Sequence, residues 1–353
     1  MRKTIAKIYL NNIRENARAF KTVTGKPLCA VVKANAYGHG AEEVVFALGG
    51  IADCFAVALL EEALEIRVAA CGKDILILTP PVDEEGILLA AKNGFILTLP
   101  DLLTAKLAVR VCEKYAVRVR VHLKTNTGMN RYGMSVQTLG KVCKCLSCVR
   151  GICVEGVYSH LYGDTRESAE AQRRLFLRMQ KICLRYFPKA VFHLSATFGS
   201  LLGKEFFFDM TRIGIGLYGY LPNSAKPFAR AKKLRLKKGM EIFAVRTAQR
   251  RYSFGGAGYG EERLLIKKGT KLSVVRYGYA DGFLRKRENG VCGQEKQANH
   301  LCMDACVRVG GGKKGELVPV MTDAEATAKA TGTIAYEVLC AATRRAEMQY
   351  DYE

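Results

Sequence analysis

The sequence has no long uninterrupted stretch of apolar residues. No apolar run in the 353 residues reaches the roughly 18–20 residues that a membrane-spanning helix needs. The basic start, MRKTIAKIYLNN, is followed by neither a continuous apolar segment nor a small-residue cleavage site, so we expect no signal peptide. Hydrophobic residues make up 49%, which is ordinary for a globular protein. We therefore expect a cytoplasmic protein without a membrane partner.

Cysteine and histidine clusters with metal-ligand spacing are also lacking. The 13 cysteines are scattered, and the single dense group, CKCLSC at 143–148, has no second Cys/His group at zinc-finger spacing. Several cysteines lie in apolar runs, where a free thiol behaves as a small hydrophobic side chain. We predict reduced cysteines and no metal site.

Acidic residues are scarce relative to basic ones. The chain carries 55 Lys and Arg against 33 Asp and Glu, which gives a formal net charge of +22. Residues 226–271 alone hold 14 Lys or Arg and 3 Glu. Such a surface could attract nucleic acid, but here the basic residues alternate with apolar ones and no aromatic stacking motif accompanies them. We interpret the segment as a solvated basic face, and only salt-dependent DNA binding would support a nucleic-acid partner.

Eight short apolar runs recur between residues 28 and 220. Amphipathic stretches with helical spacing lie between them, for example at 61–70, 84–93 and 166–186. Strands that alternate with helices predict parallel strands joined by crossover helices, and eight such units indicate a (β/α)8 barrel. The runs are LCAVV (28–32), CFAVALL (54–60), DILILT (74–79), GFILTL (94–99), VRVRVHL (117–123), CVEGVYS (153–159), AVFHLS (190–195) and RIGIGLYG (212–219).

The pattern changes after about residue 225. MEIFAVRTAQ (240–249), RLLIKKG (263–269), TKLSVVRYGYADG (270–282) and ACVRVGGG (305–312) carry strand signals without long helices between them. We predict an α/β chain with an N-terminal TIM-like barrel over residues 1–225 and a mostly β C-terminal domain over residues 226–353.

Polar and charged residues stand where the predicted barrel strands end. In a barrel of this type the functional groups gather at the strand ends, on one face of the molecule. A mouth with two lysines and two arginines suits an anionic ligand that carries phosphate or carboxylate groups. The residues are Lys33, Tyr37, Lys124, Arg131, His160, His193, Ser195, Thr197 and Arg212, with the segment GIG (214–216) after the last.

Lys33 is the strongest single candidate, because it leaves an apolar strand. A partly desolvated lysine in a cationic site has a lowered pKa and can attack a carbonyl group. Pyridoxal phosphate (PLP), an aldehyde with a phosphate group, would explain the lysine and the cationic mouth together.

Seven segments, in order, resemble those of the alanine racemase family. They are VVKANAYGHG (31–40), HLKTNTGMNRYG (122–133), GVYSHLYGDT (156–165), TRIGIGLYG (211–219), GYADGF (278–283), CMDACV (302–307) and YEVLC (336–340). The resemblance covers essentially the whole chain. It implies a PLP-dependent racemase that interconverts L- and D-alanine by two bases and supplies D-alanine for peptidoglycan.

The resemblance also implies a role for each matching residue. Lys33 would hold PLP covalently and then act as one base, and Arg212 would face the pyridine nitrogen. His160 would pack against the ring, Arg131 and Met303 would contact the substrate, and Lys124 would match a lysine that is often carbamylated. The phosphate would be held by Tyr37, Thr197, Gly214, Ile215 and Tyr336.

The second base would be a tyrosine supplied by the partner across a homodimer interface. In RRYSFGGAGYGEERLL (250–265), Tyr259 matches best by its local motif. An alignment on SFG would instead put Phe254 there, and phenylalanine cannot take a proton; Tyr252 is a third candidate. Two other functions stay open: a serine racemase of the same family, and a PLP-binding protein with little turnover.

Overall fold

The structure is a computed structural model that describes residues 4–259, 266–285, 291–292, 295–297 and 301–352. The chain divides into two compact units. The barrel unit comprises Arg14–Ala34 and Ala41–Leu236, and the sheet unit comprises Met1–Ile13, Asn35–Gly40 and Lys237–Glu353. The division of the chain into domains at 1–225 and 226–353 stays a prediction.

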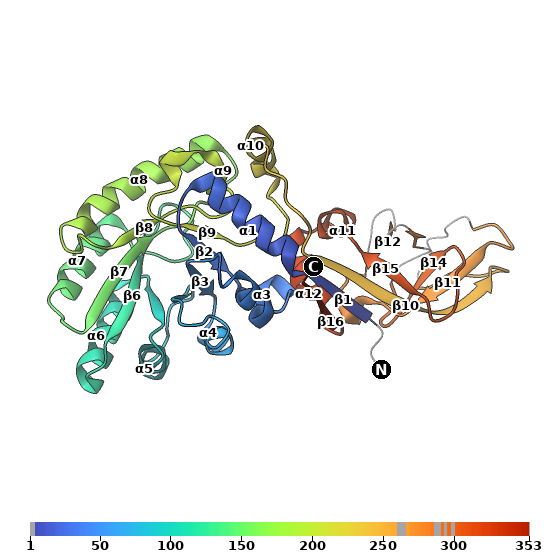
Figure 1. Ribbon diagram of the computed structural model, residues 1–353, viewed down its shortest axis with the longest axis horizontal. Coiled ribbons are helices and arrows are strands. Elements are labelled where there is room, and N and C mark those ends of the chain that lie inside the picture. The colour runs from blue at the N-terminus through green and yellow to red at the C-terminus, as the bar shows by residue number, and fades with distance from the viewer. Residues whose placement is uncertain (1–3, 260–265, 286–290, 293–294, 298–300, 353) are drawn as a thin grey trace. The chain divides into compact units, whose positions relative to one another are not determined.

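Eight parallel strands in the order β8-β7-β6-β5-β4-β3-β2-β9 build the barrel unit (Figure 1). Each of the eight predicted runs contributes one strand, so the predicted barrel is confirmed. Arg212 N, in the last of these strands, donates to Ser195 O, two residues after β8, at 3.0 Å, which links the two ends of the sheet. The strands are β2 (Leu28–Val31), β3 (Cys54–Val57), β4 (Ile75–Ile77), β5 (Ile96–Leu99), β6 (Val119–Lys124), β7 (Ile152–Tyr158), β8 (Val191–His193) and β9 (Thr211–Ile213).

Helices follow the strands and cover the outside of the barrel (Figure 1). Several begin at a side chain that accepts from a backbone N–H of the first turn: Asp83 from Gly86, Asp101 from Thr104. The helices are α1 (Leu10–Thr24), α3 (Ala41–Leu48), α4 (Leu60–Ile66), α5 (Glu84–Lys92), α6 (Leu102–Tyr115), α7 (Val136–Ser147), α8 (Arg166–Leu184), α9 (Gly199–Leu202) and α10 (Lys226–Ala231), with short 3-10 turns η1 (Lys204–Phe206) and η2 (Asn223–Ala225).

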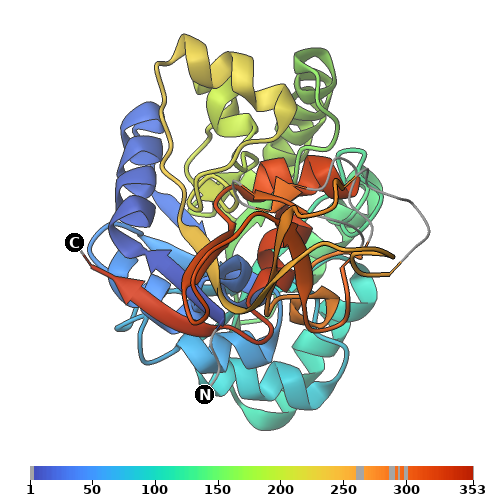
Figure 2. The same cartoon turned by 90° about the vertical axis from the view of Figure 1, so that its right-hand side faces the viewer.

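A six-stranded sheet forms the body of the sheet unit, in the order β14-β11-β10-β1-β16 with β15 also paired to β10. β1 is antiparallel to β10 and parallel to β16, so the first and last described strands are neighbours (Figure 2). The strands are β1 (Thr4–Tyr9), β10 (Met240–Arg251), β11 (Lys271–Val275), β14 (Cys306–Val309), β15 (Leu317–Met321) and β16 (Glu347–Asp351).

The sheet unit also holds a short hairpin and a few helices. The hairpin joins β12 (Val291–Cys292) to β13 (Glu295–Lys296), and the helices are η3 (Tyr279–Asp281), α11 (Ala324–Thr331) and α12 (Ala335–Ala342). The predicted mostly β character of this region is confirmed. Residues 263–265 of the predicted strand RLLIKKG lie outside the described residues.

Candidate functional site

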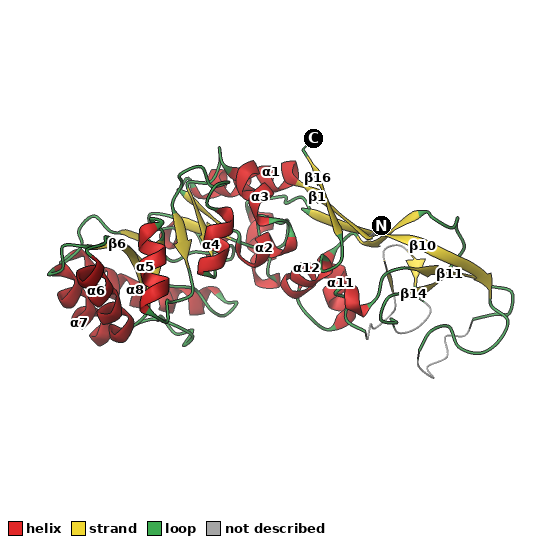
Figure 3. Ribbon diagram, turned by 90° about the horizontal axis from the view of Figure 1, so that it is seen from below, coloured by secondary structure: helices red, strands yellow, loops and turns green. Residues whose placement is uncertain are grey.

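The short helix α2 (Lys33–Gly38) is a left-handed turn (Figure 3). Lys33 is its first residue and follows strand β2 and Val32 directly. Four consecutive non-glycine residues, Ala34 to Tyr37, have φ between 52° and 54°. The left-handed region costs an L-residue about 1–2 kcal/mol, and it is normally visited by single residues. Backbone held in this way is typical of functional sites, where the surrounding structure stabilises it.

Hydrogen bonds and close packing support this left-handed turn. At its start, Glu62 Oε1 accepts from Ala34 N at 2.7 Å. At its end, Gly38 has φ of 79°, and a Cβ there would collide with the carbonyl oxygen of Leu339 in α12. Only glycine therefore fits at position 38.

Tyr37, in the turn, lies close to Tyr336, in helix α12; both belong to the sheet unit. The ring centroids of Tyr37 and Tyr336 are 6.0 Å apart, at an interplanar angle of 50°. Burial raises the pKa of both phenols, that of Tyr336 to about 12, so both hydroxyls keep their protons at neutral pH. Each can donate a hydrogen bond to an anion.

Arg212, in β9, is buried inside the barrel. Its Nη1 reaches His193 Nδ1 at 2.7 Å and His193 O at 3.0 Å, and its Nη2 donates to Ser159 O at 2.6 Å and Leu194 O at 3.2 Å. No acceptor among the described residues is bonded to its Nε–H. The guanidinium is thus rigidly fixed and retains one donor for a ligand.

Three aromatic side chains lie together next to Arg212. His193 Nε2 lies 3.0 Å from His122 Nδ1, and the ring of Tyr158 stacks on that of His193 at 4.9 Å and 11°. Burial, then the charge of Arg212, lowers the pKa of His122 to about 3 and also lowers that of His193. Both imidazoles are therefore neutral, and Arg212 is the cation of this group.

Lys124 ends β6 inside the same barrel. It is 6% exposed, and its Nζ lies 4.6 Å from the centroid of the Tyr158 ring. Burial lowers the pKa of Lys124 well below its usual range, and the charges of Arg212 and Arg131 act in the same direction. A lowered pKa increases the fraction of Lys124 that is the neutral amine, and the neutral amine is the nucleophilic form of a lysine.

The loop after β6 carries Arg131, which is exposed. Asn126 organises this loop: its Oδ1 accepts from Gly128 N at 2.9 Å and from Asn130 N at 3.2 Å. Thr127 Oγ1 also lies 2.8 Å from Ser159 Oγ, which joins the loop to the end of β7. The loop is therefore ordered around the Arg131 side chain.

His160 follows β7 and is partly buried. Burial, then the charges of Arg212, Lys124, Arg131 and Lys33, lowers its pKa well below the usual range. The structure therefore brings together, in one electrostatic neighbourhood of the barrel unit, the predicted residues Lys33, Lys124, Arg131, His160 and Arg212. The neutral imidazole of His160 can pack against an uncharged aromatic ring, while the four basic groups around it attract an anion.

Two backbone N–H groups after strand β9 make up a candidate anion cradle. Gly214 and Ile215 are buried residues, and neither N–H donates to an acceptor in the described part of the chain. Gly216 N donates to Thr197 Oγ1 at 3.3 Å, which leaves the hydroxyl proton of Thr197 for another acceptor. Buried N–H groups without a partner are rare, and neighbouring ones form concave sites for phosphate-like anions.

The candidates for the second base lie on a segment of the sheet unit that is largely exposed. Tyr259 is 62% exposed and Phe254 is 86% exposed, whereas the Tyr252 hydroxyl donates to Gly255 O at 2.6 Å. Met303, which is 52% exposed, accepts at its carbonyl from Ala280 N at 3.0 Å. Tyr259 is therefore a phenol that another molecule could reach.

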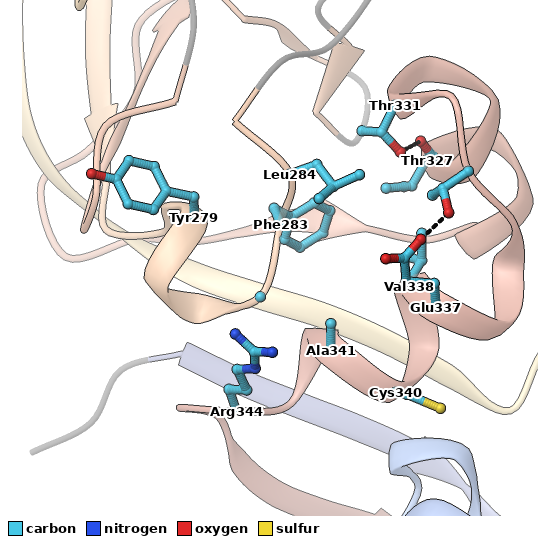
Figure 4. Close-up of a pocket in the computed structure, with 12 residues that line it drawn as sticks. Tyr279, Phe283, Leu284, Thr327, Thr331, Glu337, Val338, Cys340, Ala341 and Arg344 are labelled. Carbon is cyan, nitrogen blue, oxygen red and sulfur yellow. Dashed lines mark hydrogen bonds between the residues drawn. The ribbon is translucent and has the colours of Figure 1, made fainter.

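The sheet unit also contains a cavity of about 290 Å³ between the segment around Phe283 and helices α11 and α12 (Figure 4). Threonines, Glu337 and Arg344 line it together with Phe283, Leu284 and Val338. None of the predicted site residues lines this cavity, and the chemistry of the barrel mouth is absent from it. We assign it no part in the site.

Sequence reasoning missed three residues of this region. His122 lies inside an alternating apolar run and Tyr158 ends another, so both resemble ordinary strand positions. His39 resembles a turn residue, yet it is fully buried. For His122, the signal available was a histidine within a barrel strand, where a buried imidazole needs a hydrogen-bond partner.

No helix in the described ranges is both long and apolar enough to cross a membrane. The family model for the alanine racemase N-terminal domain matches residues 8–222, and the model for its C-terminal domain matches residues 240–350. The alanine racemase of Lactobacillus delbrueckii subsp. bulgaricus is 33% identical over 375 residues, which cover 98% of this chain and 97% of that protein. The alanine racemase of Treponema pallidum subsp. pallidum is 29% identical and covers 98% of both chains.

Solved structures give the same result. Alanine racemase from the D-cycloserine-producing Streptomyces lavendulae has a TM-score of 0.90 and 25% identity, and covers 100% of this chain and 98% of its own. The alanine racemase of Bartonella henselae, which has covalently bound pyridoxal phosphate, has a TM-score of 0.87 and 25% identity and covers 99% of both chains. Since family models match both halves, this chain belongs to the alanine racemase family.

Proposed function

We propose that this chain interconverts L- and D-alanine with pyridoxal phosphate as its cofactor. The observation that carries the proposal is the cradle at Gly214 and Ile215, whose buried N–H groups have no acceptor among the described residues. It follows β9, the strand that holds Arg212. A phosphate group would satisfy these donors, as the family's cofactor requires.

The residues present fit this cofactor at several points. Thr197, Tyr37 and Tyr336 add hydroxyl donors for the phosphate. The remaining Nε–H of Arg212 would face the pyridine nitrogen, and Arg212 would keep its own proton because a guanidinium is not deprotonated in proteins. His160 would pack against the ring. When bound, pyridoxal phosphate delocalises the electron pair left at the α-carbon of an amino acid that has lost its α-proton.

Lys33 and Tyr259 act as the two bases. Lys33 would hold the cofactor, and its Nζ would remove or return the α-proton on the D face. The partner subunit's Tyr259 does the same on the L face through its hydroxyl. Phe254 could not exchange a proton in that place, and Tyr252 already donates its hydroxyl to Gly255 O.

A homodimer with shared active sites follows from this assignment. Tyr259 is 62% exposed, so its hydroxyl is available to a second copy of the chain. Arg131 and Met303 contact the substrate, and Arg131 is directed at the substrate carboxylate. Lys124, whose pKa is lowered by burial, reacts as its neutral amine with carbon dioxide to form a carbamate; the nitrogen gains the carboxyl group and releases a proton.

Alanine is the substrate that fits best. Tyr336 places a large ring beside the substrate, which leaves room for a methyl group and offers less to a hydroxymethyl group. Serine racemisation is therefore not favoured. Cofactor binding without turnover is not favoured because both domains of the alanine racemase family are matched in this chain. We place the reaction in the cytoplasm, where its D-alanine product would supply peptidoglycan synthesis.

Proton exchange at the α-carbon tests this function. Each substrate (L-alanine, D-alanine and L-serine) is incubated separately with the enzyme and added pyridoxal phosphate in deuterated water and followed by NMR. We expect exchange and inversion of both alanine enantiomers and slower exchange of serine. Lys33→Ala should abolish the exchange, whereas Lys92→Ala, at an exposed lysine of α5, should not change it.

Two outcomes would contradict the proposal. Serine exchange faster than alanine exchange would make the chain a serine racemase. Exchange of D-alanine alone, without inversion, would mean that Lys33 works and that no tyrosine stands on the opposite face, as the Phe254 alignment requires.

A further inference from the structure

His39 lies at the end of the left-handed turn and binds its backbone directly. The imidazole is fully buried, and its Nδ1 is 3.0 Å from both Ala36 O and Tyr37 O. We propose that His39 is a positioning residue that locks the backbone between Lys33 and Tyr37, so that both ends of the cofactor are held at once. This inference rests on the proposed function, in which Lys33 binds the aldehyde end and Tyr37 the phosphate end.

The two carbonyl groups fix the tautomer of His39. Carbonyl oxygens only accept hydrogen bonds, so Nδ1 must carry the proton and donate to both. The backbone N–H of His39 also donates to Ala36 O at 3.1 Å, and Gly40 N donates to Asn35 O at 3.1 Å. The side chain and the backbone of residues 39–40 therefore bind three successive carbonyls of the turn.

Close packing holds the imidazole against the turn. A Cβ at Gly239, just before β10, would come within 3.0 Å of His39 Nε2 and 3.2 Å of its Cδ2. Gly38 in turn lies against the carbonyl of Leu339. The His39 ring is thus fully buried, with the backbone of Gly239 against its Nε2 side.

The turn needs such support because its conformation is intrinsically unfavourable. Ala34, Asn35, Ala36 and Tyr37 all have positive φ, and none is glycine. Without the Nδ1–H donor, the carbonyls of Ala36 and Tyr37 each lose a hydrogen bond. The left-handed conformation is then less stable relative to right-handed φ values. The Tyr37 hydroxyl would then lose its fixed spacing from Lys33.

The contribution of the phosphate can be measured by comparing two ligands. Pyridoxal has the aldehyde but no phosphate, so the ratio of its Kd to that of pyridoxal phosphate reports how well the phosphate end is held while Lys33 is occupied. Both affinities come from titration of apoenzyme, followed by the visible absorbance of the lysine-bound ligand. Neither requires turnover.

His39→Leu should lower this ratio by about tenfold, the size expected for loss of one well-placed hydrogen bond to a buried group. His39→Asn keeps an N–H donor close to the position of Nδ1 and should retain most of the ratio. His39→Gln places its amide near the position of Nε2 and should behave like leucine. The Asn and Gln pair keeps the test valid even if His39→Leu fails to fold.

A double variant tests whether His39 acts through Tyr37. If it does, His39→Leu combined with Tyr37→Phe should have the same ratio as Tyr37→Phe alone, because coupled residues are not additive. Equal weakening of both ligands by His39→Leu, or fully additive losses, would overturn the proposal. Failure of the proposed function looks different: the wild-type apoenzyme would then form no lysine-bound species with either ligand.

Discussion

Inside the barrel, Arg212 Nη1 lies 2.7 Å from His193 Nδ1, and His193 Nε2 lies 3.0 Å from His122 Nδ1. A guanidinium can only donate, so His193 accepts at Nδ1 and carries its proton on Nε2. His122 then accepts at Nδ1 and keeps its own proton on Nε2. The fixed charge of Arg212 thus sets the tautomers of two buried histidines in sequence.

Stability should fall on acidification because of these histidines. Burial lowers the pKa of His122 to about 3 and also lowers that of His193, whereas in the unfolded chain both return to about 6.5. Above pH 6.5 neither state binds the protons. Below it the unfolded state binds them in preference to the folded state, so His122 removes about 1.4 kcal/mol of unfolding free energy per pH unit and His193 acts in the same direction.

Urea unfolding followed by circular dichroism between pH 7 and pH 4 measures this loss. His122→Gln removes one of the two groups and should make the dependence shallower by about 1.4 kcal/mol per pH unit. An identical slope in this variant would mean that His122 is protonated in the folded protein.

The anion cradle should not tolerate a side chain at Gly216. A Cβ there would lie 2.5 Å from Phe20 Cε2 and 3.0 Å from Thr197 Cγ2. Gly216→Ala should therefore lower the unfolding free energy by about 1–3 kcal/mol, as overpacking does. It should also weaken binding of pyridoxal phosphate, because Thr197 and the Gly214 and Ile215 N–H groups move with it.

Gly140→Ala is the matched control for this change. Gly140 lies in α7, and a Cβ there would meet nothing within 4 Å. In a helix, alanine is favoured over glycine by about 0.5–1 kcal/mol, so the control should be slightly stabilised. Thermal melts and cofactor titrations of both variants would contradict the prediction if the two behaved alike.

Lys124 should form a carbamate. Burial, then the charges of Arg212 and Arg131, lowers the pKa of its Nζ and so favours the neutral amine, which is the form that reacts with carbon dioxide. In buffer with 13C-bicarbonate we expect one slowly exchanging carbamate signal in the carbon NMR spectrum. Lys124→Gln should remove this signal, and its persistence would assign the carbamate to another lysine.

Replacement of the second base should act on one enantiomer more than on the other. Tyr259→Phe removes the hydroxyl that serves the L face, so α-proton removal from L-alanine should fall by at least about 100-fold, the usual contribution of a positioned acid or base. Removal from D-alanine, which uses Lys33, should fall far less. Stopped-flow measurements with α-deuterated substrates give both rates.

Tyr252→Phe provides the control, because its hydroxyl is already bonded to Gly255 O. It should leave the two enantiomers equally affected. Equal losses with Tyr259→Phe would instead place the base elsewhere. Mixing the inactive variants Lys33→Ala and Tyr259→Phe should restore activity to about a quarter of the wild type, because a hybrid C2 dimer has one intact shared site.

The barrel could be predicted because its strands are short apolar runs with a regular spacing. Each of the eight runs contains a strand, and the polar residues at their ends lie where the prediction required them: Lys33 after β2, Lys124 at the end of β6, Arg212 in β9. Periodicity and strand ends are local properties, so a single sequence reports them.

Other features depend on partners that are distant in the sequence. The run TIAKIY (4–9) alternates as a strand should, but nothing local indicates that β1 pairs with β10 and β16. The left-handed turn at 34–37 was equally hidden, because alanine and tyrosine have no preference for positive φ. It becomes understandable only once His39, Gly38 and Leu339 are seen around it.

The pairing of β1 sets the order in which parts of the fold can form during synthesis. β1 precedes the barrel strands in the chain, yet its parallel partner β16 follows them, with Ile5 opposite Glu347. The eight barrel strands are all synthesised by Ile213, so they can assemble while both edges of β1 are still unpaired. Synthesis that stalls before β16 would therefore expose a strand edge, and such edges are where nascent chains recruit one another or a chaperone.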